Sequence, residues 1–163
     1  MTKTLLTAVI AAVALSAAPA QASSTLAVSL VPNFEGAVSC PDQQFGFALD
    51  VASLGGRTLG TGQTCIRSSK GCEPFAAFCR QTVRSTLTLN LARGSLTVPL
   101  KLLEILPSES SFIQAGSGEV SSGTGIYSHA TGRVAGGGAG SFDEQGTFTG
   151  RLVYVCDLHG VGR

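Results

Sequence analysis

Apolar residues alternate with small or polar residues along most of this sequence, and this period of two constrains the fold more than any other feature. The alternation is clear in segments 26–30, 45–51 and 87–91. Successive side chains of a β-strand point to opposite faces, so such segments are predicted to be half-buried strands. No long segment has a helical period, although residues 73–84 could form a short helix. The sequence therefore predicts an all-β protein.

Two turn signals place hairpins within this pattern. Arg93-Gly94 separates segment 87–91 from a second alternating segment, 96–102, and Asp143 to Gly146 separates Phe142 from Phe148. Counting along the chain gives about seven or eight strands with short turns, which is typical of a barrel or a sandwich. Closure into an antiparallel barrel of about eight strands removes exposed sheet edges, so this is the architecture we expect.

The N-terminal residues have the features of a secretory signal peptide. Lys3 supplies a positive start, an apolar stretch covers residues 5–18, and Ala22 ends a small-x-small cleavage motif. We therefore expect residues 1–22 to be removed and residues 23–163 to form one secreted or periplasmic domain. No later apolar run approaches the ~20 residues of a spanning helix, so no membrane span is expected after cleavage.

Five cysteines follow the signal peptide, and in an exported protein they indicate disulfides. They are Cys40, Cys65, Cys72, Cys79 and Cys156. Because the number is odd, at least one stays free or pairs between chains, and the connectivity is left open. The seven-residue spacing from Cys65 to Cys79 does not match a zinc site, and His129 and His159 lie far away in sequence. We expect one or two disulfides and no metal site.

The last third of the chain is rich in glycine, with 11 in the 35 positions of segment 116–150. Val134, Phe142 and Phe148 recur between the glycines, which is unlike a flexible linker. Glycine inside a strand marks a bulge, a bend or a close backbone approach, and a small closed barrel needs such sites. A phosphate-binding loop would require a following helix, so we expect no cofactor.

Within this stretch Gly123-Thr124-Gly125 is followed by the aromatic Tyr127, and then by Ala130 and Gly132 at the start of the next expected strand. With the continuation to residue 154, this order resembles the allene oxide cyclase and dirigent barrel superfamily. The resemblance implies an eight-stranded antiparallel barrel with an apolar interior, and it implies that homo-oligomers are common among its relatives. Those relatives cyclise a fatty-acid epoxide, steer phenoxy-radical coupling or cyclise polyketides, mainly by confining an apolar substrate. Their acidic and basic residues do not align with this chain, so no catalytic residue is carried over.

Three residues are candidate ligand contacts. Tyr127 lies in the resembling stretch, where packing at the barrel rim is the competing interpretation. Arg133 and Glu104 lie in expected strands of mixed polarity. Either charge would orient a ligand if it pointed inward, whereas a charge that points outward is simply solvated.

The charges are balanced overall but unevenly distributed. Without Lys3 the chain has ten basic and ten acidic residues, which argues against a general nucleic-acid binder. Segment 57–93 nevertheless holds six basic residues against one acid. We expect a cysteine-containing insertion near residues 57–82, which is either a solvated staple on the barrel or a surface for an acidic partner.

Two functions from different classes follow. The first is a secreted barrel that binds an apolar small molecule, with or without cyclase or stereo-directing activity. The second is a noncatalytic structural or interaction protein with a solidly packed barrel. The sequence does not decide whether the protein is an enzyme, and the packing of the barrel interior is what distinguishes the two functions.

Overall fold

The structure, a computed structural model, describes residues 23–34, 38, 40, 45–72, 78–145 and 147–162. The expected signal peptide lies outside these residues. The elements are β1 (Ser24–Asn33), β2 (Phe45–Ser53), β3 (Thr58–Lys70), β4 (Cys79–Leu91), β5 (Gly94–Ser108), β6 (Ser111–Glu119), β7 (Ser122–Gly123), the 3₁₀ turn η1 (Gly125–Tyr127), β8 (Thr131–Phe142) and β9 (Phe148–His159). No helix in this part of the chain is long and apolar enough to cross a membrane.

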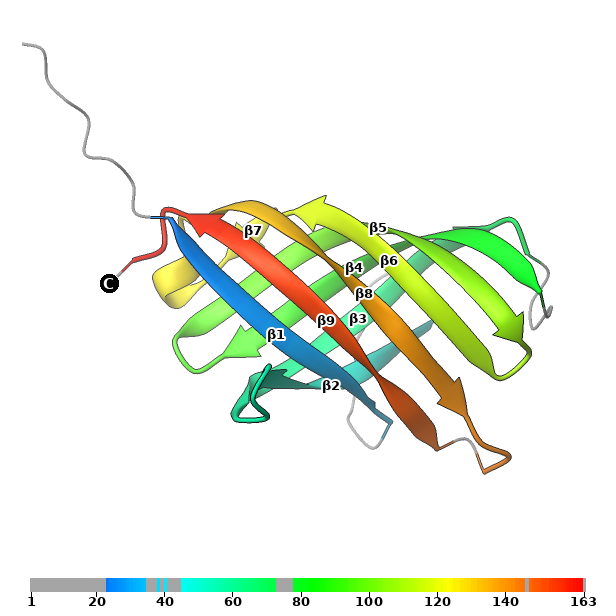
Figure 1. The fold of residues 1–163 in the computed structure, drawn as a ribbon. Helices are drawn as coiled ribbons and strands as arrows, with labels where there is room; N and C mark the ends of the chain where they lie inside the picture. Colours follow the sequence, from blue (N-terminus) through cyan, green and yellow to red (C-terminus); the bar gives the residue numbers. More distant parts are fainter. Residues whose placement is uncertain are drawn as a thin grey trace, which may run out of the picture.

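Eight of the strands close into an antiparallel barrel (Figure 1). Around the ring the order is β1, β2, β3, β4, β5, β6, β8 and β9, and β9 pairs with β1 to complete it. The short β7 lies outside the ring and pairs with β5, where Leu96 faces Gly123. Both expected hairpins are present, because Arg93 lies in the β4–β5 turn and residues 143–147 join β8 to β9. The closed barrel that the strand pattern predicted is thus confirmed.

The two ends of the barrel are built differently. At one end, η1 and its flanking residues tie neighbouring segments together: Ile126 donates its N–H to the Arg93 carbonyl at 3.0 Å, and Gly162 donates to the Ile126 carbonyl at 2.7 Å. The opposite end carries the β1–β2, β3–β4, β5–β6 and β8–β9 connections. We call these the packed end and the open end.

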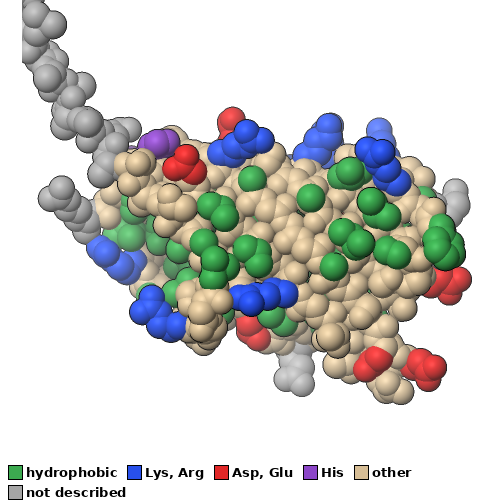
Figure 2. All heavy atoms as spheres, in the orientation of Figure 1, with side chains coloured by type: hydrophobic (Ala, Val, Ile, Leu, Met, Phe, Trp, Pro, Cys, Tyr) green, Lys and Arg blue, Asp and Glu red, His purple; other side chains and the backbone are tan. Residues whose placement is uncertain are grey.

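The inward side chains form a core that is densest toward the packed end. Leu89, Leu96, Val98 and Val134 are each fully buried there. Their strand neighbours point outward and are polar, small or partly exposed, as the period of two requires. Figure 2 shows one side of the barrel, where apolar and charged side chains are scattered among the backbone and the remaining side chains.

Several glycines on β6 and β8 leave space that is occupied by large side chains of the neighbouring strands. Gly116 on β6 is paired with Leu102 on β5, and Gly136 on β8 is paired with Tyr154 on β9. A Cβ atom on Gly116 would lie 2.8 Å from Leu102 Cδ2, and one on Gly136 would lie 2.8 Å from Tyr154 Cδ1. These glycines therefore allow the neighbouring strands and their side chains to approach closely. The sequence had left a bulge, a bend and a close approach as alternative explanations.

Two disulfides staple the barrel from outside its core. Cys40 is bonded to Cys65 on β3, and Cys72 is bonded to Cys79 across the β3–β4 connection. The sulfur of Cys40 occupies the position that a side chain of Gly46 would take. Among the described residues Cys156 is the free cysteine; it is buried on β9, and burial raises its pKa to about 11.

Two details of the sequence interpretation need correction. The segment near residues 57–82 is part of the barrel itself, because residues 58–70 form β3 and β4 starts at Cys79. The short helix suggested for residues 73–84 is wrong for residues 79–84, which are strand, while residues 73–77 lie outside the described part. In both cases the strand pairing of β3 with β4 and of β4 with β5 outweighs the local pattern.

Candidate functional site

A cavity of about 320 Å³ opens at the open end of the barrel. Its volume lies at the lower limit of typical small-molecule pockets. Leucines on the strands form its walls, among them Leu49, Leu87, Leu100 and Leu152, and Tyr154 also lines it. The interior is therefore apolar and is not completely filled by side chains.

Six of the eight phenylalanines in the chain line this cavity. They are Phe34, Phe45, Phe47, Phe112, Phe142 and Phe148. The rings of Phe142 and Phe148 lie 5.4 Å apart in an edge-to-face arrangement, and those of Phe112 and Phe148 stack at 6.0 Å. Phe34 and Phe45 remain about half exposed, at 49% and 55%. Aromatic rings that are half exposed at a mouth can cover the apolar part of a ligand without losing much entropy.

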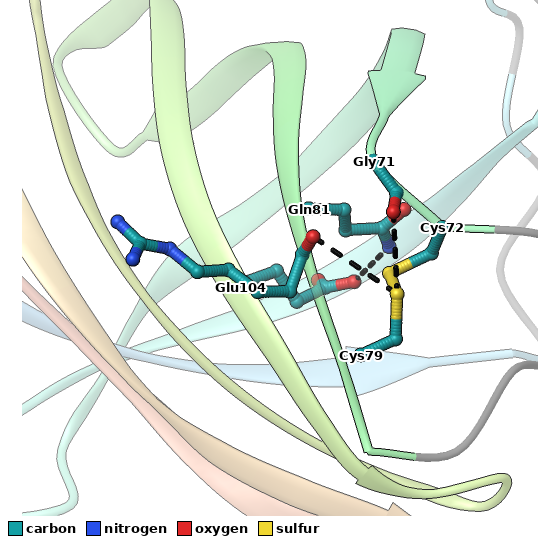
Figure 3. Close-up of a disulfide and its surroundings, with 6 residues drawn as sticks. Gly71, Cys72, Cys79, Gln81 and Glu104 are labelled. Carbon is teal, nitrogen blue, oxygen red and sulfur yellow. Dashed lines mark hydrogen bonds between the residues drawn. A yellow bond between two sulfur atoms is a disulfide. The ribbon is translucent and has the colours of Figure 1, made fainter.

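Toward the open end of the cavity, the carboxyl group of Glu104 has a neutral partner, Gln81, and Figure 3 shows these two residues. Gln81 on β4 donates from Nε2 to Oε1 of Glu104 on β5 at 2.6 Å, near the Cys72–Cys79 disulfide. Gln114 on β6 is the register partner of Glu104 on the other side and also lines the cavity. Burial raises the pKa of Glu104, and the hydrogen bond from Gln81 opposes this effect. The raised pKa favours the uncharged form of the carboxyl group.

The raised pKa of Glu104 predicts how stability depends on pH. The folded state binds the Glu104 proton more tightly than the unfolded state does. Glu104 therefore lowers the free energy of unfolding as the pH rises from the ordinary pKa of glutamate to the raised pKa in the folded protein. Glu104→Gln removes this loss and keeps an oxygen acceptor for Gln81. We expect the variant to match the wild type near pH 4 and to be more stable at pH 7, as measured by urea midpoints. The exposed Glu119→Gln serves as the surface-charge control. If the urea midpoints of the wild type and Glu104→Gln changed equally between these pH values, the prediction would be contradicted.

A second polar group lies deeper in the cavity. Ser85 on β4 lines the cavity and is 2% exposed, and its hydroxyl has no hydrogen-bond partner among the described residues. Thr86 also has a buried hydroxyl without a partner, but it does not line the cavity. Tyr154 supplies a further hydroxyl group in the cavity lining, and burial raises its pKa to about 12, so it stays protonated at neutral pH.

The three sequence candidates lie in different places. Glu104 lines the cavity. Tyr127 lies in η1 at the packed end and packs against the core. Arg133 is exposed on β8, where Nη2 donates to Ser117 Oγ at 3.3 Å. Neither Tyr127 nor Arg133 is among the described residues that line the cavity.

Sequence reasoning missed most of the cavity. Ser85 interrupts the inward apolar series of Val83, Leu87 and Leu89, so a lone serine in an apolar phase was a usable signal. The phenylalanines gave no comparable signal, because Phe34 and Phe112 become neighbours of the others only when β1 and β6 join the same ring.

The basic residues of segment 57–93 lie mainly on the outside of β3 and β4. Arg67, Lys70, Arg80 and Arg84 are all exposed. Arg84 also faces Lys101 directly across the β4–β5 pair. Like charges in this arrangement repel each other.

The described residues contain no group of three or more histidine, cysteine or acidic side chains that could hold a metal ion. No protein-family model matches this sequence, and neither a curated protein nor a solved structure matches it.

Proposed function

We propose that this protein binds an apolar small molecule inside its barrel. The observation that supports the proposal most directly is the cavity of about 320 Å³ lined by leucines and six phenylalanines. Removal of apolar surface from water is the dominant favourable contribution to such binding. A solidly packed structural barrel, the other function that we considered, would not need this space.

The resemblance of residues 116–154 to allene oxide cyclases and dirigent proteins extends the proposal. In those families a barrel confines a reactive apolar substrate and thereby directs its cyclisation or coupling. The lining of the cavity is mostly apolar, and the described residues that form it include no lysine, arginine or histidine, which suits confinement of an apolar substrate. The two disulfides suit an exported protein, in which such a barrel would act outside the cytoplasm.

A cavity-filling substitution tests the proposal. Thr64 on β3 lines the cavity, so Thr64→Phe places a ring in the space that a ligand would use. We expect the wild type to enhance the fluorescence of the neutral apolar probe N-phenyl-1-naphthylamine, and Thr64→Phe to bind it at least about tenfold more weakly. Thr61→Phe makes the same change on the exposed outer face of β3 and is the matched control.

Two results would count against the proposal. One is a wild-type protein that leaves the probe fluorescence unchanged. The other is equal probe binding by Thr64→Phe and Thr61→Phe, because the probe would then bind outside the cavity. If Thr64→Phe lowers the melting temperature strongly, Gln114→Phe on β6 repeats the test from a different strand of the cavity wall. Native mass spectrometry of the purified wild type reports any ligand that was acquired during expression.

A further inference from the structure

Ser85 is a polar group whose hydrogen-bonding capacity the protein leaves unused. Its side chain follows the inward phase of β4, between Val83 and Leu87, and is 2% exposed. Its hydroxyl accepts and donates no hydrogen bond among the described residues, although it lines the cavity. A buried hydroxyl group without a hydrogen-bond partner costs free energy. A ligand atom that forms a hydrogen bond with it therefore contributes more binding free energy than an ordinary contact would.

The position of Ser85 separates it from the polar pair formed by Gln81 and Glu104. Ser85 is paired with Leu100 on β5, whereas Gln81 is paired with Glu104. Four residues of β4 thus separate the two levels, which corresponds to about 13 Å along the strand. Between the two levels Val83 and Leu102 form an apolar wall. A ligand that reaches Ser85 therefore needs an apolar body above its polar end.

The charges around the cavity determine which polar ends can be accommodated. Among the described residues that line it there is no lysine, arginine or histidine, while Glu104 and Glu109 are both present. Arg67 lines a smaller adjoining hollow, which shares Glu104 with the cavity, but Arg67 is exposed on β3. A carboxylate next to Ser85 would lose its water without meeting a cation.

From these three observations we infer that the cavity selects an uncharged apolar molecule with a hydrogen-bonding oxygen, which Ser85 binds at the deep end, and rejects the corresponding carboxylate. A ketone, alcohol or ester oxygen accepts a hydrogen bond from the Ser85 hydroxyl group, and no covalent bond is made or broken. The inference rests on the proposed function, and it adds the chemical class of the ligand and the residue that recognises it.

Ligands of equal chain length test the inference. The displacement of N-phenyl-1-naphthylamine is measured with 2-dodecanone, dodecane and dodecanoate, at neutral pH. We expect 2-dodecanone to bind the wild type at least about tenfold more tightly than dodecanoate. Ser85→Ala should weaken 2-dodecanone about fivefold to tenfold, as the loss of one hydrogen bond implies, and leave dodecane and the probe unchanged.

The matched control is Ser111→Ala. Ser111 also lines the cavity, but its hydroxyl is already bonded to that of Ser108 at 2.6 Å. We expect this variant to retain the preference for 2-dodecanone. The measurement with Ser85→Ala should be accompanied by a melting curve, although the wild-type ligand comparison decides the charge preference without any variant.

Each contrary result has its own meaning. Dodecanoate binding as tightly as 2-dodecanone would overturn the charge preference, and loss of that binding in Arg67→Gln would show that Arg67 holds the anion. An unchanged affinity of Ser85→Ala for 2-dodecanone would overturn the assignment to Ser85. In both cases the probe still binds, so the proposed function stands. Only the absence of binding by the probe and by every ligand refutes the proposed function together with this inference.

Discussion

Gly136→Val is expected to destabilise the barrel by about 3 kcal/mol or more. A Cβ atom at this position on β8 would collide with the carbonyl oxygen of Val153 and would lie 2.7 Å from Tyr154 Cα. The first contact is with the backbone of a paired strand, so no rotamer change relieves it. The contact with Tyr154 Cα also involves the backbone, so a movement of the Tyr154 ring into the cavity does not relieve it.

Denaturant unfolding of Gly136→Val and of Ala135→Val provides the measurement. Ala135 is the preceding residue of β8, and its side chain is exposed on the outer face. We expect Ala135→Val to stay within about 0.5 kcal/mol of the wild type, as surface substitutions usually do. Similar losses in both variants would mean that valine disturbs β8 on either face, and would contradict the close approach of Tyr154 as the cause.

Removal of both disulfides is expected to produce the other large loss. The Cys40–Cys65 bond spans 25 residues and the Cys72–Cys79 bond spans 7. The chain-entropy relation gives about 3.5 kcal/mol for the longer loop and about 2.5 kcal/mol for the shorter one. Together these values are comparable with the whole stability of many domains, about 5–15 kcal/mol. A reducing agent should therefore lower the guanidinium midpoint strongly or unfold the protein.

Paired serine variants separate the two bonds. We expect Cys40→Ser with Cys65→Ser to cost more than Cys72→Ser with Cys79→Ser, because the first bond closes the longer loop. Cys156 is buried and its raised pKa keeps it protonated, so thiol exchange with the disulfides should be slow in the folded protein. Identical midpoints with and without reducing agent would show that strand pairing alone holds the barrel.

Local sequence patterns located the strands well, because the alternation of apolar and polar residues within one segment is enough to identify it as a strand. Segments 45–51, 87–91 and 96–102 all lie within observed strands, and the Arg93-Gly94 turn joins two of them. The same patterns could not show which strands are neighbours around the ring. The pairing of β6 with β8, for example, passes over β7 and η1 and depends on glycines that contribute no side chain to the pattern.

The candidate site was harder to predict for the same reason. Glu104 was recognisable as a charge in a mixed strand, but its inward direction depends on the register of β5 against β4 and β6. Tyr127 stood out through the resemblance, yet it lies at the packed end. Side chains from distant strands create the cavity jointly, so no short segment of sequence contains it.

The difference between the packed end and the open end has a kinetic consequence. With η1 and the fully buried core at one end, a molecule inside the cavity leaves by the mouth through which it came. A substitution at the mouth that leaves the contacts of the bound molecule unchanged then changes the association and dissociation rates by the same factor. For the ligand binding proposed above, changes of this kind would alter the rate of ligand exchange while the occupancy at equilibrium stays constant.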